Sequence, residues 1–431
     1  MTVSPWIAVA LALPVLLCGE ALVRRVRLLN RFNIPAPVVG GLLVALLVLI
    51  GNLSGVCELR FETGVAQRWW TWLVCTPSEW AQSPVKNVTQ PLLVAFFACI
   101  GLNASWALVK RGTLQVAIFL GLALALAVLQ NLIGVGLASM LGIPRLLGLM
   151  CGSVSMTGGH GTVMGFAQEF EAAGLDGAAV MGVAAATFGL VAGGLIGGPV
   201  GGGLIRSRGL RPTADVTADA ASDVQEVSDG ESGIISDLRR YARYGLSGLY
   251  HLLLVLVCVK LGTWVSVIIQ GTGITFPVYI GAMFVGVALR NAADVIHPRA
   301  VCTERIDTLA SILLGFFLSI AMMSLNLIEL AGVAQAMMII LTVQVVLTAI
   351  FARTVTFKVM GGDYDAAVMV AGHCGFGLGA MPNAIANMQA VTRRYGHAPR
   401  AFLVVPITGT FLVDLFNATI ITAFIHVLKG F

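Results

Sequence analysis

Long uncharged stretches alternate with short polar segments along almost the whole chain, and this pattern predicts membrane-spanning helices. A helical span requires about 20 consecutive apolar residues. The uncharged stretches are residues 32–57, 87–109, 112–144, 177–205, 308–328, 330–352 and 366–392. Further spans are predicted at residues 5–23, at two positions within 244–289, and at 401–428.

Two uncharged segments are rich in glycine and hydroxyl side chains, which disfavour a continuous helix. The first contains GSVSMTGGHGT at residues 152–162, and the second contains GHCGFGLGAMPN at residues 372–383. Unwound backbone is tolerated at membrane depth only where it is buried in protein or lines a cavity. We therefore predict two re-entrant hairpins, at about residues 146–168 and 366–392, and ten full spans from the remaining stretches.

The composition agrees with a polytopic membrane protein. Of the 431 residues, 58% are hydrophobic and 11% are charged, whereas about 25% of residues are charged in soluble domains. The basic residues lie at span ends, so the net charge of +5 does not indicate nucleic-acid binding. The first span does not resemble a cleavable signal peptide, because no basic residue precedes it.

The distribution of lysine and arginine predicts the orientation in the membrane. With the amino terminus outside, the inside segments contain Arg24, Arg25, Arg27, Arg31, Lys110, Arg111, Arg206, Arg208, Arg211, Arg239, Arg240, Arg243, Arg290, Arg299, Arg305, Arg353, Lys358, Arg393, Arg394 and Arg400. The outside segments contain Arg60, Arg68, Lys86, Arg145 and Lys429. Basic residues concentrate on the cytoplasmic side of membrane proteins. Both termini are therefore predicted outside, and a full crossing by either glycine-rich segment would destroy this asymmetry.

The two halves of the chain match each other weakly but in the same order. The matching pairs are PVVGGLLV at Pro37 with PVYIGAMFV at Pro277, FFACIGLN at Phe96 with FFLSIAMM at Phe316, and Gly152 with Gly372. An odd number of spans in each half inverts the second half relative to the first. Inverted repeats with broken helices near the membrane midplane are typical of secondary transporters.

This pattern predicts an all-α polytopic membrane protein built from an inverted repeat of five plus five transmembrane helices with two re-entrant hairpins. Residues 1–205 form the first repeat, residues 206–243 a cytoplasmic linker, and residues 244–431 the inverted second repeat. The linker is polar and rich in turn-forming residues, which favours a flexible segment.

The hairpin tips carry the first set of candidate binding groups. Helix N-terminal amides at such tips attract anions, and unwound carbonyl groups can hold a small cation. The first tip adds the hydroxyl groups of Ser153, Ser155, Thr157 and Thr162. In the second, Asn383 and Asn387 are four residues apart on one helical face. A hydroxyl group can instead bond to its own helix, but clustering on two matched hairpins favours binding.

Two further residues leave alternatives open. His160, among the glycines of the first tip, is suited to binding a carboxylate, to relaying protons or to a structural hydrogen bond with the opposite hairpin. Lys260, inside a span, is suited to extending toward the outer surface rather than acting on substrate.

Asp414 lies near the middle of the last predicted span, in PITGTFLVDLFNATII. A carboxylate at that depth is costly and indicates a function or a bond to a neighbouring helix. Thr410 and Asn417 lie four residues before it and three after it, on the same helical face. These oxygens suit a sodium ion or a proton. Asn103, in the third span, is either another lining residue or part of a satisfied core.

Cys57 and Cys75 lie in a polar loop with Trp69, Trp70 and Trp72. If the loop faces an oxidising compartment the two cysteines can pair, and the sequence leaves this open. The tryptophans are typical of an interfacial belt.

The segments GSVSMTGGHGT, GHCGFGLGAMPNAIANMQAVTRRYG and AFLVVPITGTFLVDLFNATII resemble the characteristic segments of the bacterial glutamate:sodium symporters of the GltS type, the ESS family. The resemblance implies a homodimer in the bacterial inner membrane, elevator-type alternating access, and uptake of L-glutamate coupled to sodium without another cofactor. It implies substrate at the meeting point of the tips and Asp414 as a sodium ligand. The residue pattern adds Asn417, Thr410 and Asn103 as further candidate ligands. The implied substrate positions are Ser155, Thr157, Gly158, Gly159, His160, Gly375, Gly377, Gly379, Asn383 and Asn387. The residues of the first tip add Ser153, Gly161 and Thr162 as candidates.

Two other classes of function compete with a coupled symporter. A passive channel, or a carrier for another small anion, can also use two re-entrant loops, but neither tip contains the NPA motif of water channels. An intramembrane enzyme requires a nucleophile with a base or paired metal ligands. His160 and His373 lie in different hairpins without such a motif, so we predict that the protein is not an enzyme.

Overall fold

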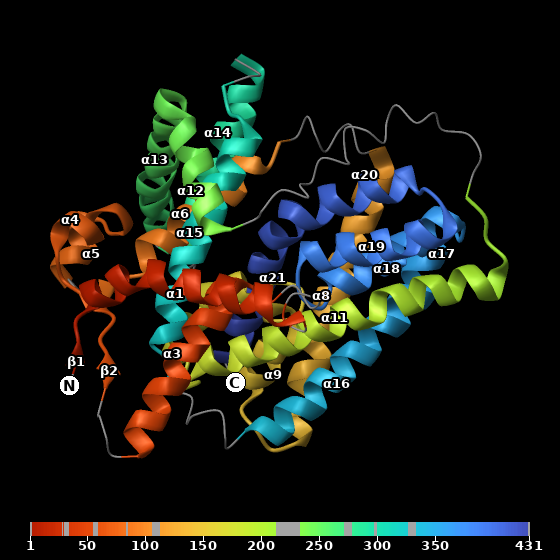
Figure 1. The fold of residues 1–431 in the computed structure, drawn as a ribbon, viewed down its shortest axis with the longest axis horizontal. Coiled ribbons are helices and arrows are strands. Elements are labelled where there is room, and N and C mark those ends of the chain that lie inside the picture. Colours follow the sequence, from red (N-terminus) through yellow and green to blue (C-terminus); the bar gives the residue numbers. More distant parts are fainter. Residues whose placement is uncertain are drawn as a thin grey trace. The chain divides into compact units, whose positions relative to one another are not determined.

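Helices make up nearly all of the described chain, as the all-α prediction requires (Figure 1). The computed structural model describes residues 2–27, 29, 34–54, 59–82, 85–105, 113–212, 233–270, 278–296, 300–325 and 333–429. Within these residues, eight helices are long and apolar enough to cross a membrane. They are α1 (Pro5–Arg25), α3 (Ala36–Leu53), α8 (Thr113–Met140), α11 (Ala178–Arg208), α13 (Gly245–Gln270), α14 (Val278–Ile296), α15 (Thr303–Met323) and α16 (Ala334–Phe351) with its continuation to Val359.

Two of the ten predicted spans are shorter or interrupted. The third is α6 (Gln90–Asn103), which has 14 residues. The last is divided into α20 (Pro399–Ile407), a π-helical turn (Thr408–Leu412) and α21 (Val413–Lys429). Pro406 lies inside α20, and a proline inside a helix removes a backbone donor and bends the chain. A single π-helical turn of this kind is frequent at functional sites, and here it ends two residues before Asp414.

The chain folds into two compact units, and each unit takes segments from both halves of the sequence. Unit 1 comprises Met1–Leu29, Pro35–Trp106 and Glu231–Ile328, and unit 2 comprises Asn30–Ile34, Ala107–Gly230 and Glu329–Phe431. Unit 1 therefore contains α1, α3 and α6 together with α13, α14 and α15. Neither unit coincides with a sequence half. The units are defined by which segments pack together, whereas the predicted repeats are continuous ranges of the sequence. The boundaries of the two repeats therefore stay a prediction.

Unit 1 is held together by close contacts between helix backbones. A Cβ atom added to Gly101 of α6 would lie 2.1 Å from the carbonyl oxygen of Met283 in α14. In the same way, a Cβ at Gly286 would lie 2.7 Å from the carbonyl oxygen of Ala98. Small residues let membrane helices approach in this manner, where van der Waals packing replaces the hydrophobic effect.

The end of the predicted flexible linker is helical, which corrects the interpretation of 206–243 as flexible throughout. Helix α12 (Ile234–Arg243) buries Ile234 against Leu16 and Ile312 of unit 1. Asp237 accepts a hydrogen bond of 2.8 Å from the hydroxyl group of Ser311. The apolar stripe of this amphipathic helix outweighs the polar composition of the segment. Residues 213–232 of the linker lie outside the described residues.

The tryptophan-rich loop of unit 1 has a defined structure. It contains β2 (Arg60–Phe61), β3 (Gly64–Val65), α4 (Arg68–Thr71), a 3-10 turn (Trp72–Val74) and α5 (Pro77–Gln82); β2 pairs with β1 (Thr2–Val3), and β3 pairs with β4 (Lys86–Asn87). The Lys260 ammonium group of α13 donates to the carbonyl oxygens of Trp72 at 2.6 Å and Cys75 at 2.9 Å. Lys260 therefore extends from its span to anchor this loop. Cys57 lies outside the described residues, so its pairing with Cys75 stays a prediction.

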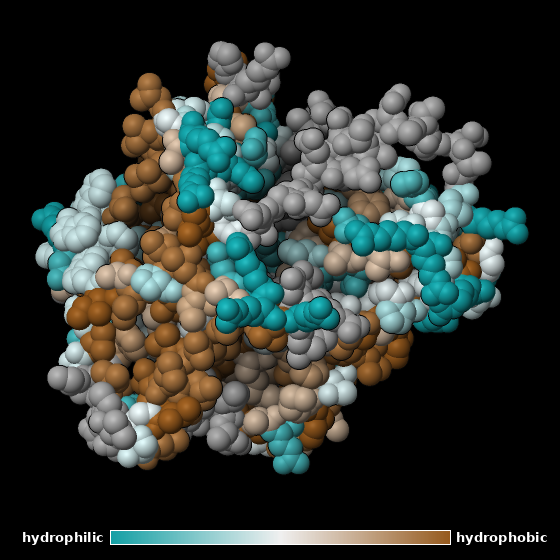
Figure 2. Space-filling view, in the orientation of Figure 1, coloured by the Kyte–Doolittle hydropathy of each residue, from teal (hydrophilic) through white to brown (hydrophobic). Residues whose placement is uncertain are grey.

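Apolar side chains cover the outer faces of several helices, as expected for a protein surrounded by lipid. Figure 2 shows hydrophobic residues gathered over α13 and α3. The exposed members include Leu46, Leu47 and Ile50 of α3 and Leu253, Val257 and Leu261 of α13. A soluble monomer rarely exposes apolar patches of such extent. The described part of the chain is thus a multi-pass membrane protein.

In unit 2, helix α11 packs against α18 (Tyr364–Phe376) and α19 (Met381–Tyr395) through glycines at every fourth position. A Cβ atom at Gly189 would lie 2.3 Å from the carbonyl oxygen of Leu378, and one at Gly193 would lie 3.1 Å from that of Gly375. A Cβ at Gly197 would lie 2.2 Å from the amide nitrogen of Asn387. The glycine stripe thus allows α11 to touch both helices (Figure 1).

Gly197→Ala is expected to destabilise the protein by about 1–3 kcal/mol, the usual cost of overpacking a tight contact. Gly198→Ala is the matched control, because a Cβ at Gly198 has no atom within 4 Å and alanine favours the helix by about 1 kcal/mol. Thermal unfolding in detergent should show a lower midpoint for Gly197→Ala only. Equal midpoints for the two variants would contradict the described packing of α11.

Candidate functional site

The first hairpin consists of α9 (Arg145–Leu149), a π-helical turn (Met150–Val154) and α10 (Gly159–Ala172). Gly152 interrupts the helix with φ −89° and ψ −138°. A Cβ at Gly152 would lie 2.6 Å from the Asn131 side-chain oxygen, so the break packs closely on α8. The second helix begins at Gly159, whose φ of +62° favours glycine. The predicted break in the helix at 152–162 is therefore present, whereas re-entry into a membrane stays a prediction.

The second hairpin consists of α18 and α19, joined by a turn at Gly377–Ala380. Asp363 caps α18 by accepting a hydrogen bond of 2.9 Å from the Ala366 amide. Pro382 lies in the first turn of α19. Backbone N–H groups have no partner within the helix at this position, so the missing N–H of proline costs no hydrogen bond. A Cβ at Gly375 would lie 2.5 Å from the Ala384 Cα atom, so the two helices pack closely.

The tips of the two hairpins meet inside unit 2. A Cβ atom at Gly159 would lie 2.6 Å from the carbonyl oxygen of Gly379. Only a glycine at position 159 permits both this approach and the left-handed backbone conformation. The structure thereby brings together two segments that the sequence identified independently, 152–162 and 372–383.

Helix α8 supplies two polar residues at the tips that sequence reasoning missed. The Gln130 side-chain oxygen accepts a hydrogen bond of 2.8 Å from the hydroxyl group of Thr157, and its amide group donates to the Gly377 carbonyl at 2.8 Å. The Asn131 side-chain oxygen accepts a bond of 2.7 Å from the Ser153 amide. Both side chains are fully buried. The sequence did contain a signal for them, because two adjacent amide side chains in an otherwise apolar membrane helix indicate polar contacts with neighbouring helices.

Several fully buried polar atoms near the first tip have no hydrogen-bond partner among the described residues. They are the hydroxyl oxygens of Ser153 and Ser155, the amide nitrogen of Asn131, and the side-chain oxygens of Gln344 and Asn417. Leaving a buried polar group unpaired costs roughly 1–3 kcal/mol. Groups of this kind are therefore candidates for contacts with a bound ion, a water molecule or a substrate.

The two histidines of the tips are buried and bound to different helices. Nε2 of His160 lies 3.0 Å from the hydroxyl oxygen of Thr187 in α11. Nδ1 of His373 lies 2.9 Å from that of Thr356, and its ring stacks on Phe376 with centroids 5.1 Å apart. His160 therefore has a structural hydrogen bond to α11, and the described contacts do not connect it to the opposite hairpin.

The asparagines of the second hairpin bind α11. The Asn383 amide group donates to the Leu190 carbonyl at 2.6 Å, and that of Asn387 donates to the Gly193 carbonyl at 2.9 Å. Both residues are buried. Their amide nitrogens therefore position the hairpin, and a role in substrate binding stays a prediction. The remaining candidate positions of the first tip, Gly158, Gly161 and Thr162, lie at the start of α10 or directly before it.

The candidate sodium ligands on the last span lie next to the first tip. The Asn417 amide group donates to the Ser153 carbonyl at 3.2 Å, while its oxygen has no described partner. Asp414 lies one turn earlier at the start of α21 and is half-buried. Among the residues whose side chains are described, none forms a hydrogen bond or ion pair with its carboxylate. Thr410 lies in the preceding π-helical turn, but its side chain lies outside the described residues.

Asn103 belongs to unit 1, whereas the other three candidate ligands belong to unit 2. Its amide group donates to a carboxylate oxygen of Asp307 in α15 at 2.6 Å.

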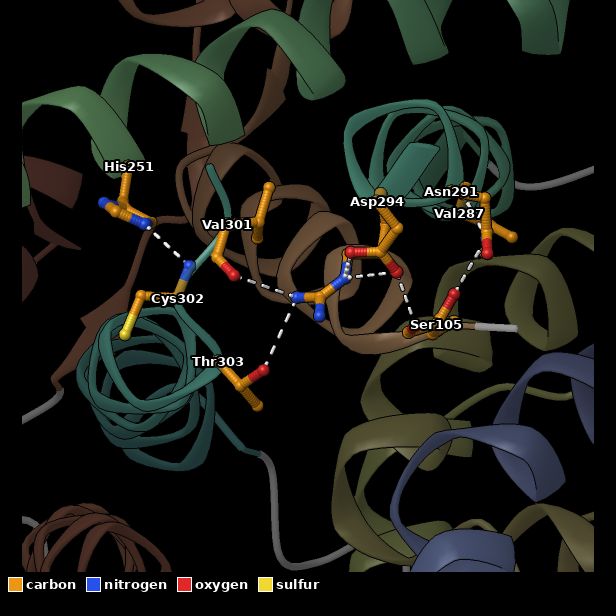
Figure 3. Close-up of polar contacts among 10 residues, drawn as sticks. Ser105, His251, Val287, Asn291, Asp294, Val301, Cys302 and Thr303 are labelled. Atoms are coloured by element: carbon orange, nitrogen blue, oxygen red, sulfur yellow. Dashed lines mark hydrogen bonds and ion pairs between the residues drawn. The ribbon is translucent and has the colours of Figure 1, made fainter. Parts of the chain in front are cut away.

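Two residues after Asn103, the Ser105 hydroxyl donates to Asp294 at 2.5 Å, and Arg290 forms an ion pair of 3.1 Å with Asp294 (Figure 3). The Ser105 bond fastens the end of α6 to α14, whereas the ion pair lies within α14. The structure therefore places Asn103 in a polar network of unit 1, and its role as a sodium ligand stays a prediction.

The chain is similar in sequence to one family of known membrane transporters. The sequence profile of the sodium/glutamate symporter family matches residues 1–76 and 77–397. The chain is 40% identical to the sodium/glutamate symporter of Escherichia coli strain K12 over 411 residues, covering 95% of this chain and 94% of that protein. It is 39% identical to the sodium/glutamate symporter of Haemophilus influenzae over 425 residues, covering 97% and 96%. This chain therefore belongs to the sodium/glutamate symporter family, a family of membrane transporters rather than enzymes.

Proposed function

We propose that the protein is a secondary transporter that couples the uptake of L-glutamate to sodium across the bacterial inner membrane. The observation that carries the proposal is the meeting of the Gly159 and Gly379 tips beside buried polar atoms without described partners. Two broken hairpins that face each other are the usual construction of a midplane substrate site. The names of the relatives supply the identity of the substrate and of the ion.

Glutamate is proposed to bind at the tips. The first tip contributes Ser155 and Thr157, and the helix that begins at Gly159 places its N-terminal amide groups at this tip. Such amide groups favour the carboxylates of a dicarboxylic acid. The unpartnered hydroxyl group of Ser155 is free to donate to a carboxylate oxygen.

Sodium is proposed to bind between the last span and the first tip. Sodium, like other hard cations, prefers oxygen ligands. Asn417 offers an unpartnered oxygen, Ser153 an unpartnered hydroxyl group, and Asp414 a carboxylate one turn away. Thr410 lies in the preceding π-helical turn, and its role as a further ligand stays a prediction. Asn103 belongs to unit 1, and its side-chain oxygen has no described partner, so its role as a ligand stays a separate prediction.

Alternating access of the elevator type is proposed, with unit 2 as the moving part. Both hairpins and the spans that hold them, α8, α11, α16 and α21, belong to this one compact unit. A substrate bound at the tips can therefore travel with its complete site. The homodimer, the inverted repeat and the outside location of both termini stay predictions.

Uptake into proteoliposomes tests the proposal directly. We expect radiolabelled L-glutamate to accumulate above its external concentration when sodium is high outside and low inside. The initial rate should saturate with glutamate, because a carrier has a limited number of sites. Potassium replaces sodium in the control, and monensin, which dissipates the sodium gradient, should release the accumulated label.

The competing functions predict different results. A passive channel would equilibrate glutamate without accumulation, and its flux would not saturate at low substrate concentration. A carrier for another small anion would transport that anion but not glutamate. Either result in proteoliposomes that contain folded protein would contradict sodium-coupled glutamate symport.

A further inference from the structure

Gln130 binds both hairpin tips at once, and we propose that it sets their spacing and thereby the selectivity of the site among dicarboxylic acids. It is bonded to Thr157 of the first tip and to the Gly377 carbonyl of the second, both at 2.8 Å. The inference rests on the proposed function, because it assigns a determinant of selectivity to the same site.

The contacts of Gln130 make it a positioning residue rather than a substrate ligand. Its side-chain oxygen is occupied by Thr157, and its amide nitrogen contacts Gly377 and, at 3.4 Å, the hydroxyl group of Thr348 in α16. The side chain is fully buried, and neither polar atom is unpartnered. A substrate would have to displace one of these bonds to reach it.

The backbone of Gln130 is itself fixed. The Gln344 amide group of α16 donates to the Gln130 main-chain carbonyl at 2.7 Å. In α8, the neighbouring residue Asn131 holds the Ser153 amide at 2.7 Å. Two consecutive residues of one rigid helix therefore hold the first tip at two points, and the first of them also holds the second tip. A membrane helix provides a firmer reference for the distance between the tips than the turns themselves.

Loss of the Gln130 amide group should loosen the tips without removing a substrate contact. The fraction of protein with correctly spaced tips then falls, and the apparent dissociation constant rises in proportion. Glutamate and aspartate differ by one methylene group, so a site with variable spacing discriminates between them less. A residue that binds the α-amino or α-carboxylate group, which the two acids share, would instead change the affinity for both by about the same factor.

Gln130→Met is the main test, because methionine has nearly the same length and no side-chain hydrogen bond of comparable strength. At saturating sodium, we expect its KM for glutamate to rise about tenfold or more, because the variant loses the hydrogen bonds to both Thr157 and Gly377. The maximal rate per folded transporter should change much less, and the ratio of KM values for aspartate and glutamate should move toward one. Gln389→Met is the matched control, since Gln389 is exposed on α19.

Hydrogen exchange gives a readout that does not depend on transport. In Gln130→Met, amides of residues 155–162 and 375–380 should exchange faster together, while those of α14 in unit 1 stay unchanged. Gln130→Glu serves as a second variant. At a pH at which its carboxylate is ionised, it keeps an oxygen for Thr157 but loses the donor to Gly377, so exchange should accelerate mainly at the second tip.

The proposal is overturned if KM and selectivity stay at wild-type values, or if both acids lose affinity equally while exchange at the tips is unchanged. If Gln130→Met fails to fold, Gln130→Glu decides by the same criteria. A failure of the proposed function would be visible differently, as absence of sodium-driven glutamate uptake by the wild-type protein.

Discussion

Asp414→Asn is expected to weaken the apparent affinity of sodium in glutamate uptake by about ten- to hundredfold, as for loss of a charged partner. The substitution keeps the size of the side chain and one of its oxygens, so the fold should persist. It removes the only carboxylate in the proposed sodium site, which lies one turn from the unpartnered oxygen of Asn417. The measurement is the sodium dependence of initial uptake rates in proteoliposomes.

Coupling between ion and substrate makes this prediction specific. Sodium and glutamate must promote each other's binding by the same factor, because coupling free energies are reciprocal. Glutamate affinity should therefore be nearly normal for Asp414→Asn at saturating sodium and reduced at low sodium. A direct contact between Asp414 and glutamate would instead lower glutamate affinity at every sodium concentration.

Asp176→Asn provides the control for Asp414→Asn. Asp176 is an exposed residue in the turn between α10 and α11, so the same chemical change occurs outside the proposed site. Its sodium dependence should equal that of the wild type. If Asp414→Asn is folded and shows the same sodium dependence as this control, the carboxylate is structural and the proposed ion site is wrong.

Local chemistry was enough to locate both tips from the sequence. The glycines and hydroxyl residues of 152–162 and 372–383 interrupt apolar helices, and the structure has breaks at both places. Gly152 breaks the first helix, and the glycines that follow Phe376 end α18. Backbone conformation depends mainly on such local preferences, so sequence patterns report it well.

The partners of the polar side chains could not be predicted, because they depend on which helices pack together. Asn103 was identified as a candidate ligand, yet its amide binds Asp307, 204 residues further along the chain. Gln130 and Gln344 lie in helices that read as ordinary apolar spans. Nothing in either sequence segment indicates that α16 lies beside α8, or that unit 2 combines parts of both halves.

Helix α12 was missed for a different reason. Its sequence, IISDLRRYAR, places apolar residues on one face and charges on the other. The polar composition of the whole linker concealed this periodicity. The ten residues of α12 taken alone predict an amphipathic helix. The pattern was therefore present in the sequence, in contrast to the contacts of Asn103.

Gly159→Ala is expected to weaken glutamate binding by about five- to hundredfold, because overpacking a close contact costs roughly 1–3 kcal/mol. The added Cβ would lie 2.6 Å from the Gly379 carbonyl oxygen, so the tips must move apart. A second cost arises from the backbone, since φ at this position is +62° and alanine is strained there. Equilibrium binding of glutamate to the purified protein at saturating sodium measures the combined effect.

Gly142→Ala separates these two costs. Gly142 lies in the turn between α8 and α9 with φ +69°, and a Cβ added there has no atom within 4 Å. Both variants therefore carry a similar backbone strain of about 1–2 kcal/mol, and both should unfold at a lower temperature than the wild type. Only Gly159→Ala separates the tips, so it alone should lose glutamate affinity. If both variants bind glutamate as tightly as the wild type, contact between the tips does not form the substrate site.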